Sequence, residues 1–134
     1  LLLMARSTPQ ALAASEAAIA AMRKVPDVIM PFPGGIVRSG SKVGGKYKGM
    51  MASTNDAYCP TLKGVTKSEL TPEIGSVLEI VIDGLTSAAV ADAMRVGIKA
   101  VTDLGPQEGA VRIGAGNYGG NLGPHHFHLK DLLP

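Results

Sequence analysis

Two helical segments, separated by a long polar stretch with no repeating pattern, limit how this chain can fold. Thr8 as N-cap and Pro9 at the first helical position predict the start of an Ala-rich helix over Ala11–Lys24. A second helix is predicted over Ser87–Thr102, where apolar residues recur at helical spacing. Ala-rich helices pack closely onto a sheet, so both helices are expected to cover one.

Four apolar segments predict strands around these helices, and two of them are interrupted. They are Leu1–Ala5, Val28–Met30 resuming at Ile36–Val37 after two prolines, Ser76–Asp83, and Val111–Ile113, which Phe127–Leu129 would complete beyond the glycine-rich Gly114–Pro124. The resulting β-α-β-β-α-β order predicts an α+β, ferredoxin-like sandwich: an antiparallel sheet with helices on one face and a long inserted loop.

Composition excludes several classes of protein. The 134 residues suffice for one domain, and only 4% are aromatic, so Ala, Val, Ile, Leu and Met must build the core. A formal net charge of +2 is too small for a dedicated nucleic-acid-binding protein. No stretch is long enough for a membrane span, and a single Cys means no internal disulfide, which fits a reducing cytosol. The chain begins with an apolar strand and no Met, so we expect it to be a fragment whose preceding residues are missing.

The polar stretch Ser41–Thr61 is predicted to be an ordered binding segment for an anionic or highly polar ligand. Loops this long and varied are usually functional or disordered, and the Tyr and Cys content argues against disorder. Donors for a phosphate or carboxylate include the backbone of Gly34-Gly35 and the side chains of Ser39, Ser41, Lys42, Lys46 and Lys48, although a solvated loop explains them equally well. Ser53, Thr54, Asn55 and Asp56 could bind a pterin or sugar, or simply form turns.

Glu79 is the most informative single residue, because it is a carboxylate in the middle of an otherwise apolar strand. A carboxyl group partly removed from water there would suit proton transfer near neutral pH. The alternative, favoured by the strand pattern alone, is that its face of the sheet is exposed to solvent.

The Cys and His residues have simpler explanations. Cys59 would need an activating base, and His125, His126 and His128 supply one only if they fold near it, so a buried structural Cys is favoured. The three histidines resemble a metal cluster, with His126 and His128 on one side of a strand, but they lack a fourth ligand other than Cys59. Incidental histidines on a C-terminal strand are favoured, and no metal is expected.

Four long blocks of the chain closely resemble the C-terminal half of formylmethanofuran:tetrahydromethanopterin formyltransferases. They are PFPGGIVRSGSKVGGKYKGMMASTNDAYCPT, LEIVIDG, AMRVGIKA and AGNYGGNLGPHHFHLKDLL, in the same order as in that family. The resemblance covers essentially the whole chain. It implies that residues 1–134 form the C-terminal lobe of a two-lobe, ferredoxin-like enzyme whose N-terminal lobe is missing here, so that the fragment alone would be inactive.

The resemblance also implies an activity and a site. Family members move a formyl group between methanofuran and N5 of tetrahydromethanopterin, their co-substrates, without a metal or prosthetic group. The family's proposed catalytic glutamate falls on Glu79. Ser53, Thr54 and Asn55 would be nearby polar groups, and Ser41, Lys42 and Lys46 would meet the acidic groups of the carriers. A cytoplasmic homotetramer is implied.

The near-neutral charge resembles bacterial methylotroph members rather than acidic archaeal ones. In such organisms the enzyme serves formaldehyde oxidation with formyl hydrolase subunits as partners. The competing interpretation is a non-enzymatic ferredoxin-like domain that binds or senses a small ligand. An RNA-binding version of that fold would need exposed aromatics on a central strand, and SVLEIVID has none.

Overall fold

A computed structural model describes residues 1–39, 55–116 and 124–133 as an α+β fold with antiparallel sheets. The main sheet has four strands in the order β3 (Val37–Arg38), β4 (Ser76–Glu79), β1 (Leu2–Ala5) and β6 (Arg112–Gly114). A smaller sheet pairs β2 (Val28–Ile29) with β5 (Asp83–Gly84). The predicted α+β class and the antiparallel pairing are therefore confirmed.

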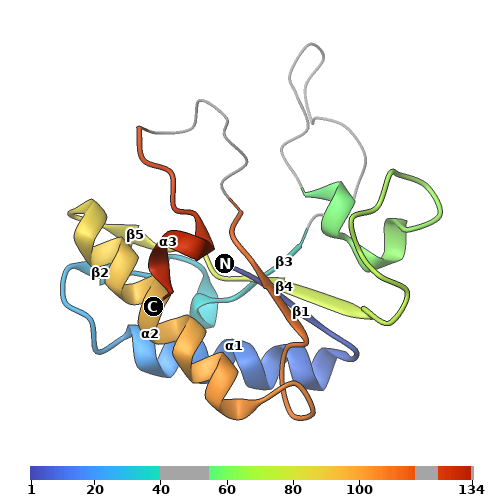
Figure 1. Ribbon diagram of the computed structural model, residues 1–134, viewed down its shortest axis with the longest axis horizontal. Helices are drawn as coiled ribbons and strands as arrows, with labels where there is room; N and C mark the ends of the chain where they lie inside the picture. The colour runs from blue at the N-terminus through green and yellow to red at the C-terminus, as the bar shows by residue number, and fades with distance from the viewer. Residues whose placement is uncertain (40–54, 117–123, 134) are drawn as a thin grey trace.

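Two long helices, α1 (Thr8–Met22) and α2 (Ser87–Leu104), lie together on one face of the main sheet (Figure 1). Each begins at a hydroxyl-bearing N-cap: Ser7 Oγ accepts from the backbone N–H of Gln10 at 3.4 Å, and Thr86 Oγ1 accepts from that of Ala89 at 3.1 Å. Such caps satisfy donors that have no partner inside a helix. The described part also contains a short helix α3 (Leu129–Leu132) and single 3₁₀ turns over Pro33–Gly35, Asp56–Tyr58 and Pro60–Leu62.

Helix boundaries differ slightly from the sequence prediction. The N-cap is Ser7 rather than Thr8, and α1 ends at Met22, so Arg23 and Lys24 lie beyond its last turn. The second helix extends past Thr102 to Leu104. Periodicity locates a helix, but the residue at which it ends depends on local backbone geometry that the pattern does not specify.

Three strand predictions were wrong. Val28–Met30 and Ile36–Val37 do not form one interrupted strand, because β2 pairs with β5 in the small sheet and β3 pairs with β4 in the main sheet. Ser76–Asp83 is not one strand: β4 ends at Glu79, and Asp83 joins the small sheet opposite Ile29. Phe127–Leu129 is not a strand, because Leu129 begins α3 and the preceding residues pair with no described strand. A strand needs a partner as well as an apolar sequence, and the partner is set by the tertiary fold.

The two faces of the main sheet are buried by different parts of the chain. Leu3, Ile80 and Ile113 pack against Ala14, Ala18, Ile19 and Met22 of α1 and Ala93 and Val101 of α2. On the opposite face, Leu2, Met4 and Val77 pack with Ile74, Tyr58 and Leu70. We call residues 55–74, which supply that second layer, the insertion. The sheet is thus covered on both faces, although only one carries helices.

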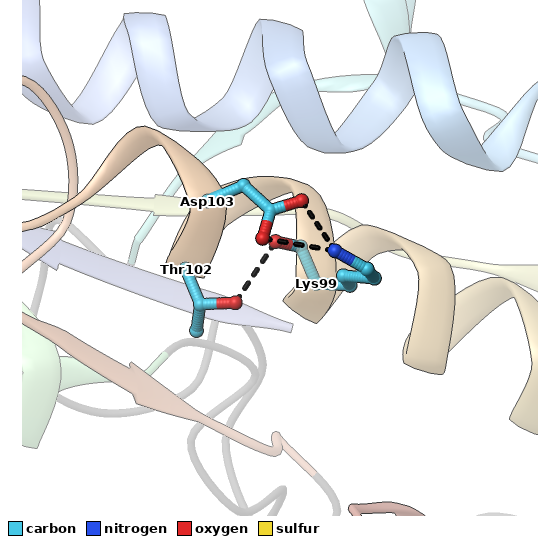
Figure 2. Close-up of polar contacts among 3 residues, drawn as sticks. All are labelled: Lys99, Thr102 and Asp103. Carbon is cyan, nitrogen blue, oxygen red and sulfur yellow. Dashed lines mark hydrogen bonds and ion pairs between the residues drawn. The ribbon is translucent and has the colours of Figure 1, made fainter.

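The outer face of α2 is polar and held by local contacts. Lys99 Nζ reaches both carboxylate oxygens of Asp103 at 2.9 and 2.6 Å, and Thr102 Oγ1 donates to the Lys99 carbonyl at 2.8 Å (Figure 2). Exposed pairs one helical turn apart add only about 0.3–0.5 kcal/mol. These contacts mark the solvent side of α2 rather than a binding site.

Gly97 permits the close approach of α1 and α2, and its replacement should be destabilising. A Cβ at Gly97 would overlap the thioether end of Met22, which is fully buried between the helices. We expect Gly97→Val to lower the free energy of unfolding of the full-length protein by about 1–3 kcal/mol, as overpacking does. Gly64→Val is the matched control, because a Cβ there meets nothing within 4 Å. Equal unfolding temperatures for the two variants would contradict the packing argument.

Candidate functional site

Glu79 is the last residue of β4 and lies on the face of the sheet covered by the insertion. It is paired with Leu2 on one side and Val37 on the other. Paired residues in a sheet share a face, and so do residues two apart along a strand. Glu79 therefore lies on the same face as Leu2 and Val77, both 2% exposed, and is itself half-buried. This face of the sheet is therefore covered, and the alternative that Glu79 lies on a solvent-exposed face is wrong.

Asn55 contacts Glu79 across the fold. The Asn55 side-chain amide Nδ2 donates a hydrogen bond to Glu79 Oε1 at 3.1 Å, although the two residues are 24 positions apart. The carbonyl of Asn55 accepts from the backbone N–H of Tyr58 at 3.0 Å, which starts the 3₁₀ turn Asp56–Tyr58. The insertion thus presents an amide donor to the strand carboxylate. A hydrogen bond of this kind restricts the rotamer of the glutamate.

These two side chains lie in the wall of a cavity of about 360 Å³ at the end of the main sheet. Hydrogen bonds in both directions between the backbones of Leu1 and Ile80, at 2.7 and 2.9 Å, continue the β1–β4 ladder to the cavity. Most of the lining is apolar and comes from five separate parts of the chain: Leu1, Leu2, Ile80, Val81, Ile82, Val90, Met94, Gly116 and Phe127.

The cavity combines an apolar wall with one carboxylate and one amide. Ligand sites are commonly apolar with a few placed polar groups that fix orientation. Glu79 can accept or donate a proton at its carboxyl oxygens, and Asn55 holds it in one orientation. The arrangement suits acid–base chemistry on an uncharged group bound beside the carboxylate.

Of the catalytic and substrate-binding residues that the family resemblance implies, the structure describes Glu79 and Asn55. Glu79 and Asn55 are brought together, whereas Ser41, Lys42, Lys46, Lys48, Ser53 and Thr54 lie outside the described residues. Ser39 is 2% exposed, and its hydroxyl has no hydrogen-bond partner in the described ranges, but it does not line the cavity. Gly35 is needed for packing: its φ is 84°, and a Cβ there would overlap Ile19 of α1.

Cys59 and the three histidines all lie in the part of the chain that the structure describes. Cys59 is 4% exposed, and its Sγ lies 3.1 Å from the Thr61 hydroxyl. His125, His126 and His128 do not lie on a strand, because the chain there leads into α3. Within residues 1–39, 55–116 and 124–133, no three His, Cys, Asp or Glu side chains are grouped as a metal would require. None of the helices described is long and apolar enough to cross a membrane.

Sequence reasoning missed the apolar wall of the cavity. Val90 and Met94 are among the apolar residues of the predicted helix Ser87–Thr102, and Phe127 belonged to a predicted strand, but neither pattern indicated a shared cavity. Phe127 is one of two Phe residues in a chain with few aromatics, and this rarity was the one available signal. The convergence of α2, the segment before α3 and the end of β4 is a tertiary feature that no local pattern reveals.

Comparisons with known proteins agree on one family. Residues 1–132 match the family described as FTR, proximal lobe. The chain is 67% identical over 132 residues to the formylmethanofuran–tetrahydromethanopterin formyltransferase of Methylobacillus flagellatus, covering 98% of the chain and 44% of that protein. It is 63% identical over 133 residues to a subunit of the formyltransferase/hydrolase complex of Methylorubrum extorquens, covering 99% of the chain and 43% of that protein.

Solved structures of formyltransferases have the same fold as this chain. The crystal structure of the Methylorubrum extorquens formyltransferase/hydrolase complex with methylofuran aligns with a TM-score of 0.86 at 62% identity, over 98% of this chain and 42% of that one. The Methanosarcina barkeri formyltransferase aligns with a TM-score of 0.83 at 41% identity, over 98% and 44%. The chain spans less than half the length of the relatives it matches. It belongs to the family of FTR proximal lobes.

Proposed function

We propose that this chain is the C-terminal, proximal lobe of an enzyme that moves a formyl group between formylmethanofuran and N5 of tetrahydromethanopterin. The observation that carries the proposal is the Glu79–Asn55 pair in the wall of an apolar cavity. The 67% identity to a formyltransferase of that specificity supports the same substrates. The two carriers are co-substrates, and we propose that no prosthetic group takes part.

The chemistry requires proton transfer at two nitrogens. The attacking amine adds to the formyl carbon and forms a C–N bond, which gives a tetrahedral intermediate with negative charge on oxygen. The attacking nitrogen then loses its proton, the leaving nitrogen gains one, and the original C–N bond breaks. We assign Glu79 the role of accepting the first proton and returning it to the leaving nitrogen, so the reaction needs no net proton.

The pairing of Glu79 with Asn55 supports this assignment. A proton relay must be held within hydrogen-bonding distance of both nitrogens, and a free glutamate side chain would visit several rotamers. Asn55 occupies one carboxyl oxygen, Oε1, at 3.1 Å, which leaves the second oxygen for the reacting group. The apolar wall formed in part by Val90, Met94 and Phe127 would exclude water from that group.

We also propose roles for the site residues that lie outside the described part of the chain. We assign Ser53 and Thr54, which directly precede Asn55 in sequence, as hydroxyl donors to the oxyanion or carriers. Ser41, Lys42 and Lys46 would bind the acidic groups of the carriers.

We propose a wider architecture for the full-length protein. A second lobe precedes residues 1–134 and completes the active-site cleft. The strand order β3-β4-β1-β6 with both long helices on one face supports a ferredoxin-like class for this lobe. The Methylorubrum extorquens relative belongs to a formyltransferase/hydrolase complex, which supports formyl hydrolase subunits as partners. We also propose that the full-length protein forms a homotetramer in the cytoplasm.

The direct test is formyl transfer from formylmethanofuran to tetrahydromethanopterin by the full-length protein. Product formation supports the proposal. A protein that binds either carrier without turnover would instead support the alternative, a non-enzymatic ligand-binding domain.

Removing the Asn55 amide should slow turnover more than it weakens binding. We expect Asn55→Ala to lower kcat roughly tenfold, within the ~100-fold that a 1 Å misplacement of a reacting group can cost. The KM for each carrier should change less than kcat, because Asn55 acts on Glu79. Gln107→Ala removes an exposed side-chain amide in the loop after α2 and serves as the control, with kcat unchanged. A raised KM at constant kcat in Asn55→Ala would assign Asn55 to substrate binding instead.

A further inference from the structure

Lys63 makes an unusually complete set of hydrogen bonds. Its Nζ donates to the carbonyl oxygens of Thr71 at 3.0 Å, Pro72 at 3.2 Å and Ile74 at 2.5 Å. A protonated lysine has three N–H donors, and here each has its own acceptor. These bonds join the end of the turn Pro60–Leu62 to the residues that lead into β4.

The contacts of Lys63 close the insertion into a loop with its two ends at the sheet. One end is Asn55, hydrogen-bonded to Glu79, and the other is Ile74, which is 1% exposed in the core layer beneath. Between them, the backbone N–H of Glu69 donates to the carbonyl of Ala57 at 2.9 Å. Arg112 of β6 donates to the Glu69 carbonyl at 3.2 Å and attaches the middle of the insertion to the sheet edge.

We infer that Lys63 is a positioning residue for the active site: its ammonium group fixes the insertion so that Asn55 meets Glu79. The inference rests on the proposed function, because it assigns Lys63 an effect on turnover through Asn55 and Glu79. Lys63 itself lines no part of the cavity that holds those two side chains. Its effect is therefore on geometry and not on contact with substrate.

The positive charge and compact shape of the lysine head group both matter. Three carbonyl oxygens that converge on one point repel one another unless a cation neutralises their partial charges. A planar guanidinium presents its donors in a fixed fork and does not match three acceptors around a point, so Lys63→Arg is not conservative. Lys63→Met keeps an unbranched side chain as far as Cε but removes the ammonium group, which leaves three carbonyls without their donor.

The experiment measures formyl transfer by full-length Lys63→Met, Asn55→Ala and the double variant. We expect Lys63→Met to lower kcat between fivefold and tenfold, on the scale of the ~100-fold that a 1 Å displacement can cost, with KM for both carriers within twofold. The double variant should be no slower than Asn55→Ala alone, because both changes remove the same restraint on Glu79. Lys67→Met, which changes another lysine of the insertion, is the matched control and should keep the parent kcat.

Hydrogen exchange of the same proteins supplies a readout that does not depend on activity. The amides of Tyr58 and Glu69, which bond the carbonyls of Asn55 and Ala57, should exchange faster in Lys63→Met than in Lys67→Met. If Lys63→Met does not fold, Lys63→Gln is measured instead, since it has a polar but uncharged and shorter side chain that cannot supply all three hydrogen bonds. The same criteria then apply to Lys63→Gln.

The outcomes separate this inference from the proposed function. Unchanged kcat in the Lys63 variant, unchanged amide exchange, or losses that multiply in the double variant would each overturn the role of Lys63. In all three cases an active parent and an inactive Glu79→Gln would leave the proposed function standing. An inactive parent enzyme would remove the proposed function, and with it this inference.

Discussion

Replacing Glu79 with glutamine should lower kcat for formyl transfer by about 10²–10⁴-fold, the range that general acid–base catalysis typically supplies. Glutamine keeps the shape of the side chain, and its carbonyl oxygen can still accept from Asn55 Nδ2. It cannot take up the proton of the attacking nitrogen or return one to the leaving nitrogen. The measurement is steady-state formyl transfer by full-length Glu79→Gln, with binding of each carrier determined separately.

The control for this prediction is Glu73→Gln. Glu73 is an exposed glutamate of the insertion and lies outside the cavity wall, so its variant should match the parent. Both carriers should still bind to Glu79→Gln, since a carboxylate that only moves protons adds little to affinity. Full turnover in Glu79→Gln would remove this residue from the mechanism, and lost binding would make it a substrate ligand.

Leu3→Ala should strongly destabilise the fold. Leu3 is 0% exposed in the central strand β1, where it is paired with Leu78 of β4 and Ile113 of β6, and it belongs to the cluster that joins the sheet to both helices. Truncating a buried leucine costs about 2–5 kcal/mol, because the transfer free energy is lost and a cavity remains. Thermal or denaturant unfolding of the full-length protein measures the loss.

Leu85→Ala makes the same chemical change at a side chain that is 82% exposed, so it serves as the control. We expect its free energy of unfolding to remain within about 0.5 kcal/mol of the parent, as for most surface substitutions. A similar loss in both variants would mean that Leu85 is covered in the full-length protein. A small loss in Leu3→Ala would contradict the central place of β1 in the core.

The amino-acid pattern was sufficient for the elements with strong local signals. Both long helices and strand β1 lie where Ala-rich composition, apolar residues at helical spacing and a short apolar run predicted them, although the N-cap of α1 is Ser7 and not the predicted Thr8. Hydrophobic periodicity predicts such elements well, because a helix or strand that buries one face must carry apolar residues at regular intervals along its whole length. Glu79 also stood out as a carboxylate in an apolar strand, although the strand pattern alone favoured a solvent-exposed face.

The tertiary structure decided which segments are partners. The apolar run from Val77 to Ile82 predicts a continuous strand, yet β4 ends at Glu79 and the chain joins a second sheet at Asp83. Three further contacts exist only because distant segments fold side by side. Asn55 bonds to Glu79, Lys63 bonds to Ile74, and Phe127 lines the same cavity as Val90 and Met94 of α2. Local propensity acts over a few residues, whereas these contacts join residues 11 to more than 30 positions apart, so their energies appear only once the chain is compact.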